Sequence, residues 1–148
     1  MVDVRTEIVI KRSAAVVSDF AMNPDNAPRW YVNIVAAEWK TARPLRVGSR
    51  VAFVARFLGR ELRYTYEVVD LTPHRRLCMR TSEGPFPMET TYEFDAVGDA
   101  ACRMRLRNRG SPRGFSALLA PFVAFAMRHA NRKDLLRLRM LLEAEQPG

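Results

Sequence analysis

The sequence predicts an α+β fold, in which a curved antiparallel sheet of seven strands wraps around one long C-terminal helix. Two observations carry this prediction. Apolar and polar residues alternate with period two along successive segments between residues 4 and 109, as in strands that are wet on one face. After residue 115 the apolar residues recur instead at helical spacing, which is typical of an amphipathic helix.

The N-terminal quarter of the chain predicts one strand and two short helices. The strand is expected over residues 4–11, where Ile8 and Ile10 alternate with Glu7 and other neighbours. Ser13 is a suitable N-cap for a helix over residues 14–21 because its hydroxyl can accept a hydrogen bond from a free amide. Pro24 ends that helix, and a turn or second helix then leads to Trp30.

Six further strands and the long helix complete the fold. The strands are expected over residues 34–41, 50–58, 61–70, 76–82, 88–96 and 102–109, and the helix over 116–143. Pro121 predicts either the start of the regular helix or a kink in it. Because one helix cannot cover seven strands, we expect a cavity between the sheet and this helix.

Composition indicates one globular domain over residues 1–148, with 48% apolar and 27% charged residues. No apolar stretch is long enough to span a bilayer, and the acidic N-terminus is unlike a signal peptide, so we expect a cytoplasmic protein. Two cysteines and two histidines without CxxC or HExxH predict no metal. The absence of glycine-rich phosphate loops predicts no nucleotide, and we expect no cofactor.

The net charge of +8 raises the question of an anionic partner. Arg103, Arg105, Arg107 and Arg109 form a row on the predicted outer face of the last strand. That row can contact phosphate, but acids on the preceding strand fall opposite it, so cross-strand ion pairs are favoured. The bases of the C-terminal helix are interpreted as a solvated face.

The inner face of the predicted sheet is more polar than a closed core tolerates. Three tyrosines share it with threonines and an asparagine, which favours a lined cavity over a dry core. Aromatic residues in proline-flanked loops are expected at its mouth. The predicted ligand-binding residues are Trp30, Phe53, Phe57, Tyr64, Tyr66, Met79, Thr81, Phe86, Met88, Thr90, Tyr92, Met104, Asn108, Phe122, Phe125 and His129.

Three of these residues are also candidates for catalysis. Tyr66 and Tyr64 can donate a hydrogen bond to a carbonyl or developing enolate oxygen. His129 follows Phe122 and Phe125 on the predicted buried face of the helix, and its ordinary pKa suits proton transfer. The alternatives are core tyrosines with satisfied hydroxyls and a neutral histidine at the seam between helix and sheet.

Several stretches, taken in order, resemble one known family. They are Ile8-Val9-Ile10 with residues 13–20, Pro28-Arg29-Trp30, Ala37-Glu38-Trp39-Lys40 through residue 50, residues 67–77 and residues 131–143. Together they resemble the START/Bet v 1-like (SRPBCC) superfamily, in its polyketide cyclase/dehydrase and lipid-transport branch. The resemblance covers nearly the whole chain and implies the helix-grip fold.

The resemblance also implies a function, although the superfamily includes enzymes, carriers and ligand sensors. It implies a hydrophobic or aromatic ligand, lipid-like or polyketide-like, in the cavity. In the enzymatic version, a cofactor-free cyclase or dehydrase, tyrosine hydroxyls would stabilise enolate charge and His129 would move the proton. In the other version the protein is a carrier or sensor.

A second hypothesis comes from the basic charge. The chain would then be an interaction module that binds RNA, a ribosome or a protein partner, as some relatives in the superfamily do. The outer faces lack the interleaved aromatic and basic residues of RNA platforms, which disfavours this hypothesis. No DNA partner is expected, and an exposed Phe86 loop would favour a homodimer.

Overall fold

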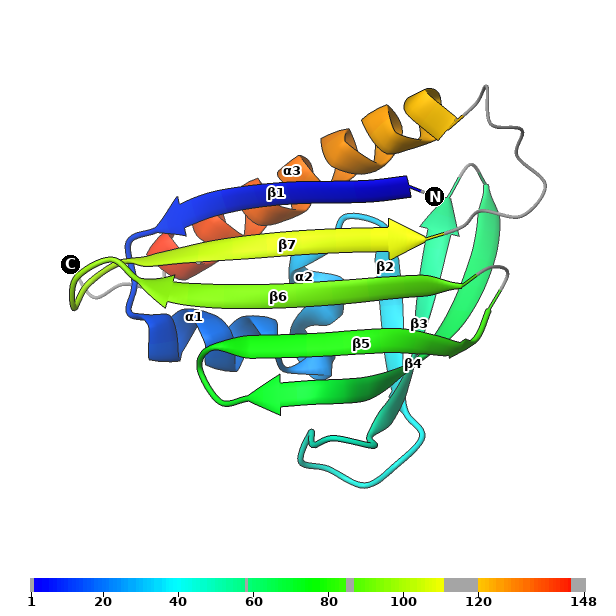
Figure 1. Ribbon diagram of the computed structural model, residues 1–148, viewed down its shortest axis with the longest axis horizontal. Coiled ribbons are helices and arrows are strands. Elements are labelled where there is room, and N and C mark those ends of the chain that lie inside the picture. The colour runs from blue at the N-terminus through cyan, green and yellow to red at the C-terminus, as the bar shows by residue number, and fades with distance from the viewer. Residues whose placement is uncertain (1, 58, 85–86, 111–119, 145–148) are drawn as a thin grey trace.

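One antiparallel sheet of seven strands forms the body of the protein in the computed structural model, which describes residues 2–57, 59–84, 87–110 and 120–144. The order across the sheet is β1-β7-β6-β5-β4-β3-β2 (Figure 1). The strands are β1 (Val2–Ile10), β2 (Ile34–Trp39), β3 (Arg50–Phe57), β4 (Arg60–Thr72), β5 (Arg76–Glu83), β6 (Met88–Ala96) and β7 (Cys102–Gly110). The helices are α1 (Ala14–Ala21), α2 (Ala27–Trp30) and α3 (Ala120–Ala144), with a 3-10 turn, η1, at Pro24–Asn26.

The predicted fold class is confirmed, and the element bounds differ from the predictions by a few residues. The strand β6 runs as predicted, whereas β4 extends to Thr72 and β2 ends at Trp39. Ser13 caps α1, because its Oγ accepts a hydrogen bond from the Val16 amide at 3.2 Å. Residues 116–119 of the predicted helix lie outside the described residues.

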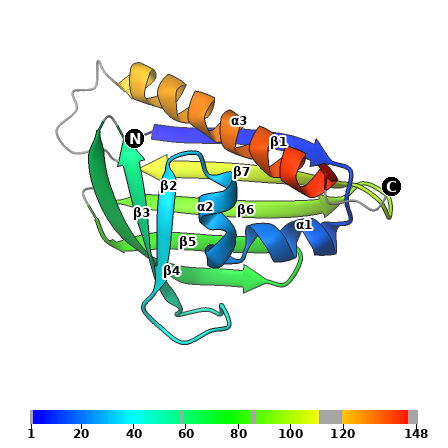
Figure 2. The same ribbon diagram turned by 180° about the vertical axis from the view of Figure 1, so that it is seen from behind.

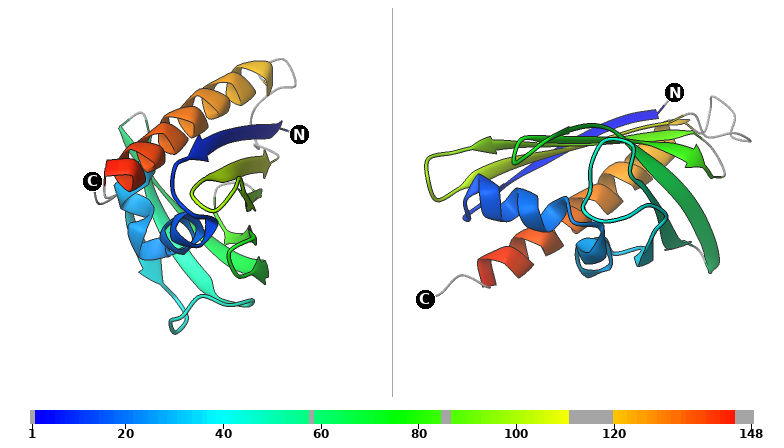
Figure 3. Two further views of the ribbon diagram at one scale, coloured as in Figure 1. Left: turned by 90° about the vertical axis from the view of Figure 1, so that its left-hand side faces the viewer. Right: turned by 90° about the horizontal axis from the view of Figure 1, so that it is seen from below.

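The helices all lie on the concave side of the sheet (Figure 2). The view from below shows two layers, with the strands above and α1, α2 and α3 beneath them (Figure 3). The long helix α3 runs beside β1 at one edge of the sheet, and α2 packs next to β2. Consequently α3 covers one side of the concave face, and the shorter helices cover part of the rest.

The core lies between these two layers. Leu135, Leu138 and Leu142 of α3 are at most 1% exposed and belong to one hydrophobic cluster with inner side chains of the sheet. Trp30 on α2 is fully buried and fills the space beside them. Among the described residues, no helix is long and apolar enough to cross a membrane.

The outer face of the sheet neutralises its own arginine row, as predicted. Glu93 lies opposite Arg105, and Asp95 lies opposite Arg103. Arg105 forms an ion pair with Asp95 at 2.9 Å, and Arg107 forms one with Asp3 at 2.7 Å. Hydrogen bonding to Arg107 is the main reason that the pKa of Asp3 is lowered. These exposed pairs stabilise the fold only modestly.

The orientation of α3 predicts how two neighbouring leucines contribute to stability. Leu138 is fully buried, whereas Leu136 is 50% exposed. We expect Leu138→Ala to lower the free energy of unfolding by about 2–5 kcal/mol, and Leu136→Ala by about 0.5 kcal/mol. Chemical denaturation of both variants measures the difference, and equal losses would contradict this orientation of the helix.

Candidate functional site

A pocket of about 160 Å³ lies between the middle of the sheet and the segment that joins α2 to β2. We call it the central pocket. Every strand from β3 to β7 contributes a side chain to it, and apolar surface predominates in its wall. Its lining residues are Tyr31, Ile34, Phe53, Ala55, Tyr64, Tyr66, Met79, Thr90, Tyr92 and Asn108.

The structure brings together in this pocket fewer than half of the predicted ligand-binding residues: Phe53, Tyr64, Tyr66, Met79, Thr90, Tyr92 and Asn108. Trp30 and Met104 are fully buried in the core instead. Thr81 and Met88 line a separate surface groove, where the Thr81 hydroxyl accepts a hydrogen bond from the Met88 amide at 2.9 Å. Phe86 and the side chain of Phe57 lie outside what the structure describes.

Three residues of the C-terminal helix that were predicted to face the sheet are exposed instead. Phe122 and Phe125 are 72% and 71% exposed, and His129 is also exposed. The helix has apolar residues on two sides, and the side that carries Leu135 and Leu138 is the one that faces the sheet. No described lining residue of the central pocket belongs to α3, so the expected position of the cavity, against that helix, is corrected to the α2–β2 segment. The role of His129 in proton transfer stays a prediction. His129 lines a different groove from the one that Tyr64 and Tyr66 line.

Two phenols meet at one side of the central pocket. The hydroxyls of Tyr31 and Tyr92 form a hydrogen bond with each other. Burial raises the pKa of both groups well above the ordinary value, so both are neutral at pH 7. Since their mutual hydrogen bond uses one of their two hydroxyl hydrogens, the other stays able to reach a ligand.

A second polar group lies across the pocket around Tyr66. Burial raises the pKa of Tyr66 to about 12, an effect partly offset by hydrogen bonding with Thr90. The Thr90 hydroxyl donates a hydrogen bond to the side-chain oxygen Oδ1 of Asn108 at 2.7 Å. Because the hydrogen of Thr90 is directed at Asn108, the Tyr66 hydroxyl can donate to the Thr90 oxygen or to a ligand.

A buried carboxyl group stands behind the tyrosine pair. Asp134 on α3 is 4% exposed and accepts a hydrogen bond from the Val32 amide at 2.9 Å. Desolvation raises its pKa to about 6, although the Val32 amide and the charge of Arg137 act in the opposite direction. Its negative charge in turn raises the pKa values of Tyr31 and Tyr92.

Sequence reasoning missed both Tyr31 and Asp134. Tyr31 follows Trp30 at the end of α2, where no periodicity indicates which way a side chain points. Asp134 directly follows Arg132 and Lys133, and charged residues of this kind are typically exposed to solvent. The one available signal was its helical spacing from Leu138, which places both on one side of the helix.

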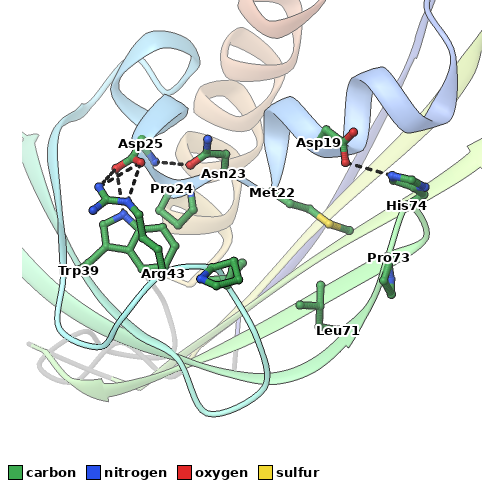
Figure 4. Close-up of a pocket in the computed structure, with 12 residues that line it drawn as sticks. Asp19, Met22, Asn23, Pro24, Asp25, Trp39, Arg43, Leu71, Pro73 and His74 are labelled. Atoms are coloured by element: carbon green, nitrogen blue, oxygen red, sulfur yellow. Dashed lines mark hydrogen bonds and ion pairs between the residues drawn. The ribbon is translucent and has the colours of Figure 1, made fainter.

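A larger pocket of about 420 Å³ opens among α1, η1 and the loops beside β2 and β4 (Figure 4). Asp25 accepts hydrogen bonds from the Arg43 guanidinium and from Trp39 Nε1, both at 2.9 Å. His74 Nε2 lies 3.0 Å from Asp19 Oδ1. These polar groups are paired with one another and hold the loops together, which makes the central pocket the better candidate site. Among the described residues, no cluster of side chains is suited to hold a metal ion.

Comparison with known families agrees with the geometry of the fold. Residues 1–143 match the family described as polyketide cyclase / dehydrase and lipid transport. The chain belongs to this family, which confirms the resemblance seen in the sequence. No curated protein is similar enough in sequence to match this chain.

Solved structures with the same fold are distant in sequence. TTHA0849 from Thermus thermophilus shares 21% identity at a TM-score of 0.81, with 97% of this chain and 99% of that one covered. The di-domain ARO/CYC protein BexL of the BE-7585A biosynthetic pathway shares 20% identity at a TM-score of 0.78. The match covers 97% of this chain and 47% of the BexL chain. The ZhuI aromatase/cyclase from Streptomyces sp. R1128 shares 15% identity at a TM-score of 0.77, with 95% of this chain and 93% of the ZhuI chain covered. At these identities the likeness establishes the fold alone.

The buried carboxyl of Asp134 predicts a specific pH dependence of stability. Its pKa is about 6 in the folded protein against 3.8 for the ordinary group, so the native state holds the proton more tightly. This contribution to stability is fully present below about pH 4 and is lost as the pH rises through about 6. The two pKa values differ by about 2, which corresponds to about 3 kcal/mol.

The measurement compares the wild type with Asp134→Asn, which keeps an acceptor for the Val32 amide. We expect the free energy of unfolding of the wild type, relative to the variant, to fall by about 2 kcal/mol between pH 4 and pH 7. Taking the difference removes the contributions of the other titrating groups. A difference that does not change with pH would show that the native carboxyl has an ordinary pKa.

Proposed function

We propose that this protein binds a hydrophobic or aromatic small molecule, of a polyketide-like class, in the central pocket. The observation that carries the proposal is the combination of a mostly apolar wall with neutral phenols at two places on it. Binding sites for small molecules have this composition, with a few polar groups that fix the orientation of the ligand. Membership of the family and the similarity in fold to an aromatase/cyclase support the same ligand class.

The volume limits what the pocket takes without rearrangement. A protein cavity of about 150 Å³ holds one benzene-sized ring, and the central pocket measures about 160 Å³. We therefore propose that one ring of the ligand occupies the space between Phe53, Met79 and Tyr92. The remainder of a larger ligand would extend toward the exposed side of Tyr64, which is only partly buried.

The enzymatic form of the proposal is a cyclase or dehydrase. A ligand with a carbonyl oxygen near Tyr66, or near the Tyr31–Tyr92 pair, would receive a hydrogen bond from a neutral phenol. The same hydrogen bond strengthens as negative charge develops on that oxygen in an enolate, which lowers the barrier to its formation. Holding the chain of the ligand folded would add the effect of proximity. Phenols are protonated at neutral pH, so the hydroxyl hydrogens needed for this donor role are in place.

Filling the pocket tests whether ligands bind there. Ala55 lines the central pocket from β3, and Ala55→Phe places a ring in the space proposed for the ligand. We expect this variant to weaken binding of acetophenone and ethylbenzene by at least about tenfold, as followed by amide chemical shifts in NMR titrations. The matched control is Ala15→Phe on the exposed side of α1, which should bind as the wild type does. Equal binding by both variants would place the ligand elsewhere.

A hydroxyl deletion tests the donor role of the tyrosines. Acetophenone and ethylbenzene have similar shapes, but only acetophenone carries a carbonyl oxygen. We expect Tyr66→Phe to weaken acetophenone binding about fivefold, the worth of one ordinary hydrogen bond, and to leave ethylbenzene binding within about twofold. If both ligands lose affinity equally, the effect is one of packing and the phenol does not donate.

A further inference from the structure

The helix α3 carries apolar side chains on its outer side as well as on its inner one. Its outer side is apolar at four large side chains that the described chain leaves exposed: Phe122 at 72%, Phe125 at 71%, Leu136 at 50% and Met140 at 64%. In Figure 2 this helix lies in front of the sheet, and no other element is drawn over it. Core packing therefore does not account for these residues.

Helical geometry places these residues on one continuous strip. With 3.6 residues per turn, positions 122, 125, 129, 136 and 140 fall on the same side of a helix, opposite Leu138 and Leu142. From Phe122 to Met140 the strip is about 27 Å long. We call this exposed strip, with the bases beside it, the α3 outer face.

Five basic residues lie on or beside the strip: Arg128, Arg132, Lys133, Arg137 and Arg139. None of the five forms an ion pair within the part of the chain that the structure describes, although the charge of Arg137 acts on the buried Asp134. On the outer face of the sheet, in contrast, Arg80, Arg105 and Arg107 each form an ion pair with a carboxylate. Glu143, near the end of the helix, accepts a hydrogen bond from the Lys11 amide. Unneutralised positive charge therefore collects on the α3 outer face.

The α3 outer face and the central pocket lie on either side of one short segment, residues 31–34. Phe125, His129 and Lys133 line a groove of about 340 Å³ together with Val32 and Asn33. The neighbouring residues Tyr31 and Ile34 line the central pocket on the other side of the same segment. Four consecutive residues thus separate the outer face from the central pocket.

We propose that the α3 outer face docks on an anionic lipid bilayer surface. An exposed apolar ridge flanked by bases matches such a surface, since the apolar side chains enter the headgroup region while the bases meet lipid phosphates. A second copy of this chain is disfavoured as the occupant, because a symmetric contact would bring two basic faces together. The proposal does not depend on the ligand of the central pocket, although it would bring the wall of that pocket to the membrane.

Sedimentation with vesicles tests the proposal. The wild type should bind vesicles of phosphatidylcholine mixed with phosphatidylglycerol at low salt, and bind pure phosphatidylcholine at least about tenfold more weakly. The charge reversal Arg132→Glu/Lys133→Glu and the apolar deletion Phe122→Ser/Phe125→Ser should each weaken binding to the mixed vesicles by at least about tenfold. All four side chains are exposed, so these variants should keep the thermal stability of the wild type.

Matched controls use exposed residues away from α3. Arg46→Glu/Arg75→Glu makes the same change of charge, and Val47→Ser/Val97→Ser removes exposed apolar surface. Both controls should bind the mixed vesicles within about twofold of the wild type.

The proposal is overturned if the wild type does not bind mixed vesicles at low salt, or if the controls lose as much binding as the α3 variants. Retention on single-stranded RNA that the α3 variants lose, without vesicle binding, would also overturn it. Since none of these changes touches the central pocket, binding of acetophenone separates a failure here from a failure of the proposed function.

Discussion

The structure depends on one constraint, which is that the apolar concave face of a seven-stranded sheet must be removed from water by elements too narrow to cover it. The helix α3 packs beside β1, where Leu135, Leu138 and Leu142 are buried. The middle of the sheet is left to α1, α2 and the segment that follows α2. Burial of Trp30 fills part of the space there, and the central pocket is what remains. The pocket is thus a consequence of how the layers meet.

The same constraint sets the chemistry of the pocket. Polar groups that lie in the gap lose water and have to find partners in one another. Tyr31 pairs with Tyr92, and Thr90 pairs with Asn108. Desolvation raises the pKa values of the phenols and of the Asp134 carboxyl, and the site presents neutral phenol hydroxyls as hydrogen-bond donors in apolar surroundings. That combination suits the recognition of a carbonyl or hydroxyl on an aromatic ring.

The sequence predicted the elements better than it predicted which side chains line the central pocket. Period-two alternation identifies the inner face of β6 and β7, because the side chains of a strand have only two directions. The helix was harder, because α3 is apolar on opposite sides and contacts across the fold decide which side is buried. Phe122 and Phe125 were assigned to the wrong side for that reason. Tyr31 lies beyond the last turn of α2, where only the tertiary structure sets its direction.

The most direct test of the account asks which side chains a bound ring touches. Intermolecular nuclear Overhauser effects between acetophenone and methyl-labelled protein report this contact without relying on any substitution. The account predicts effects to the methyl groups of Ile34, Ala55 and Met79, which line the central pocket. Effects confined to Met22, Leu45 and Leu71, in the larger pocket between α1 and the loops, would contradict it.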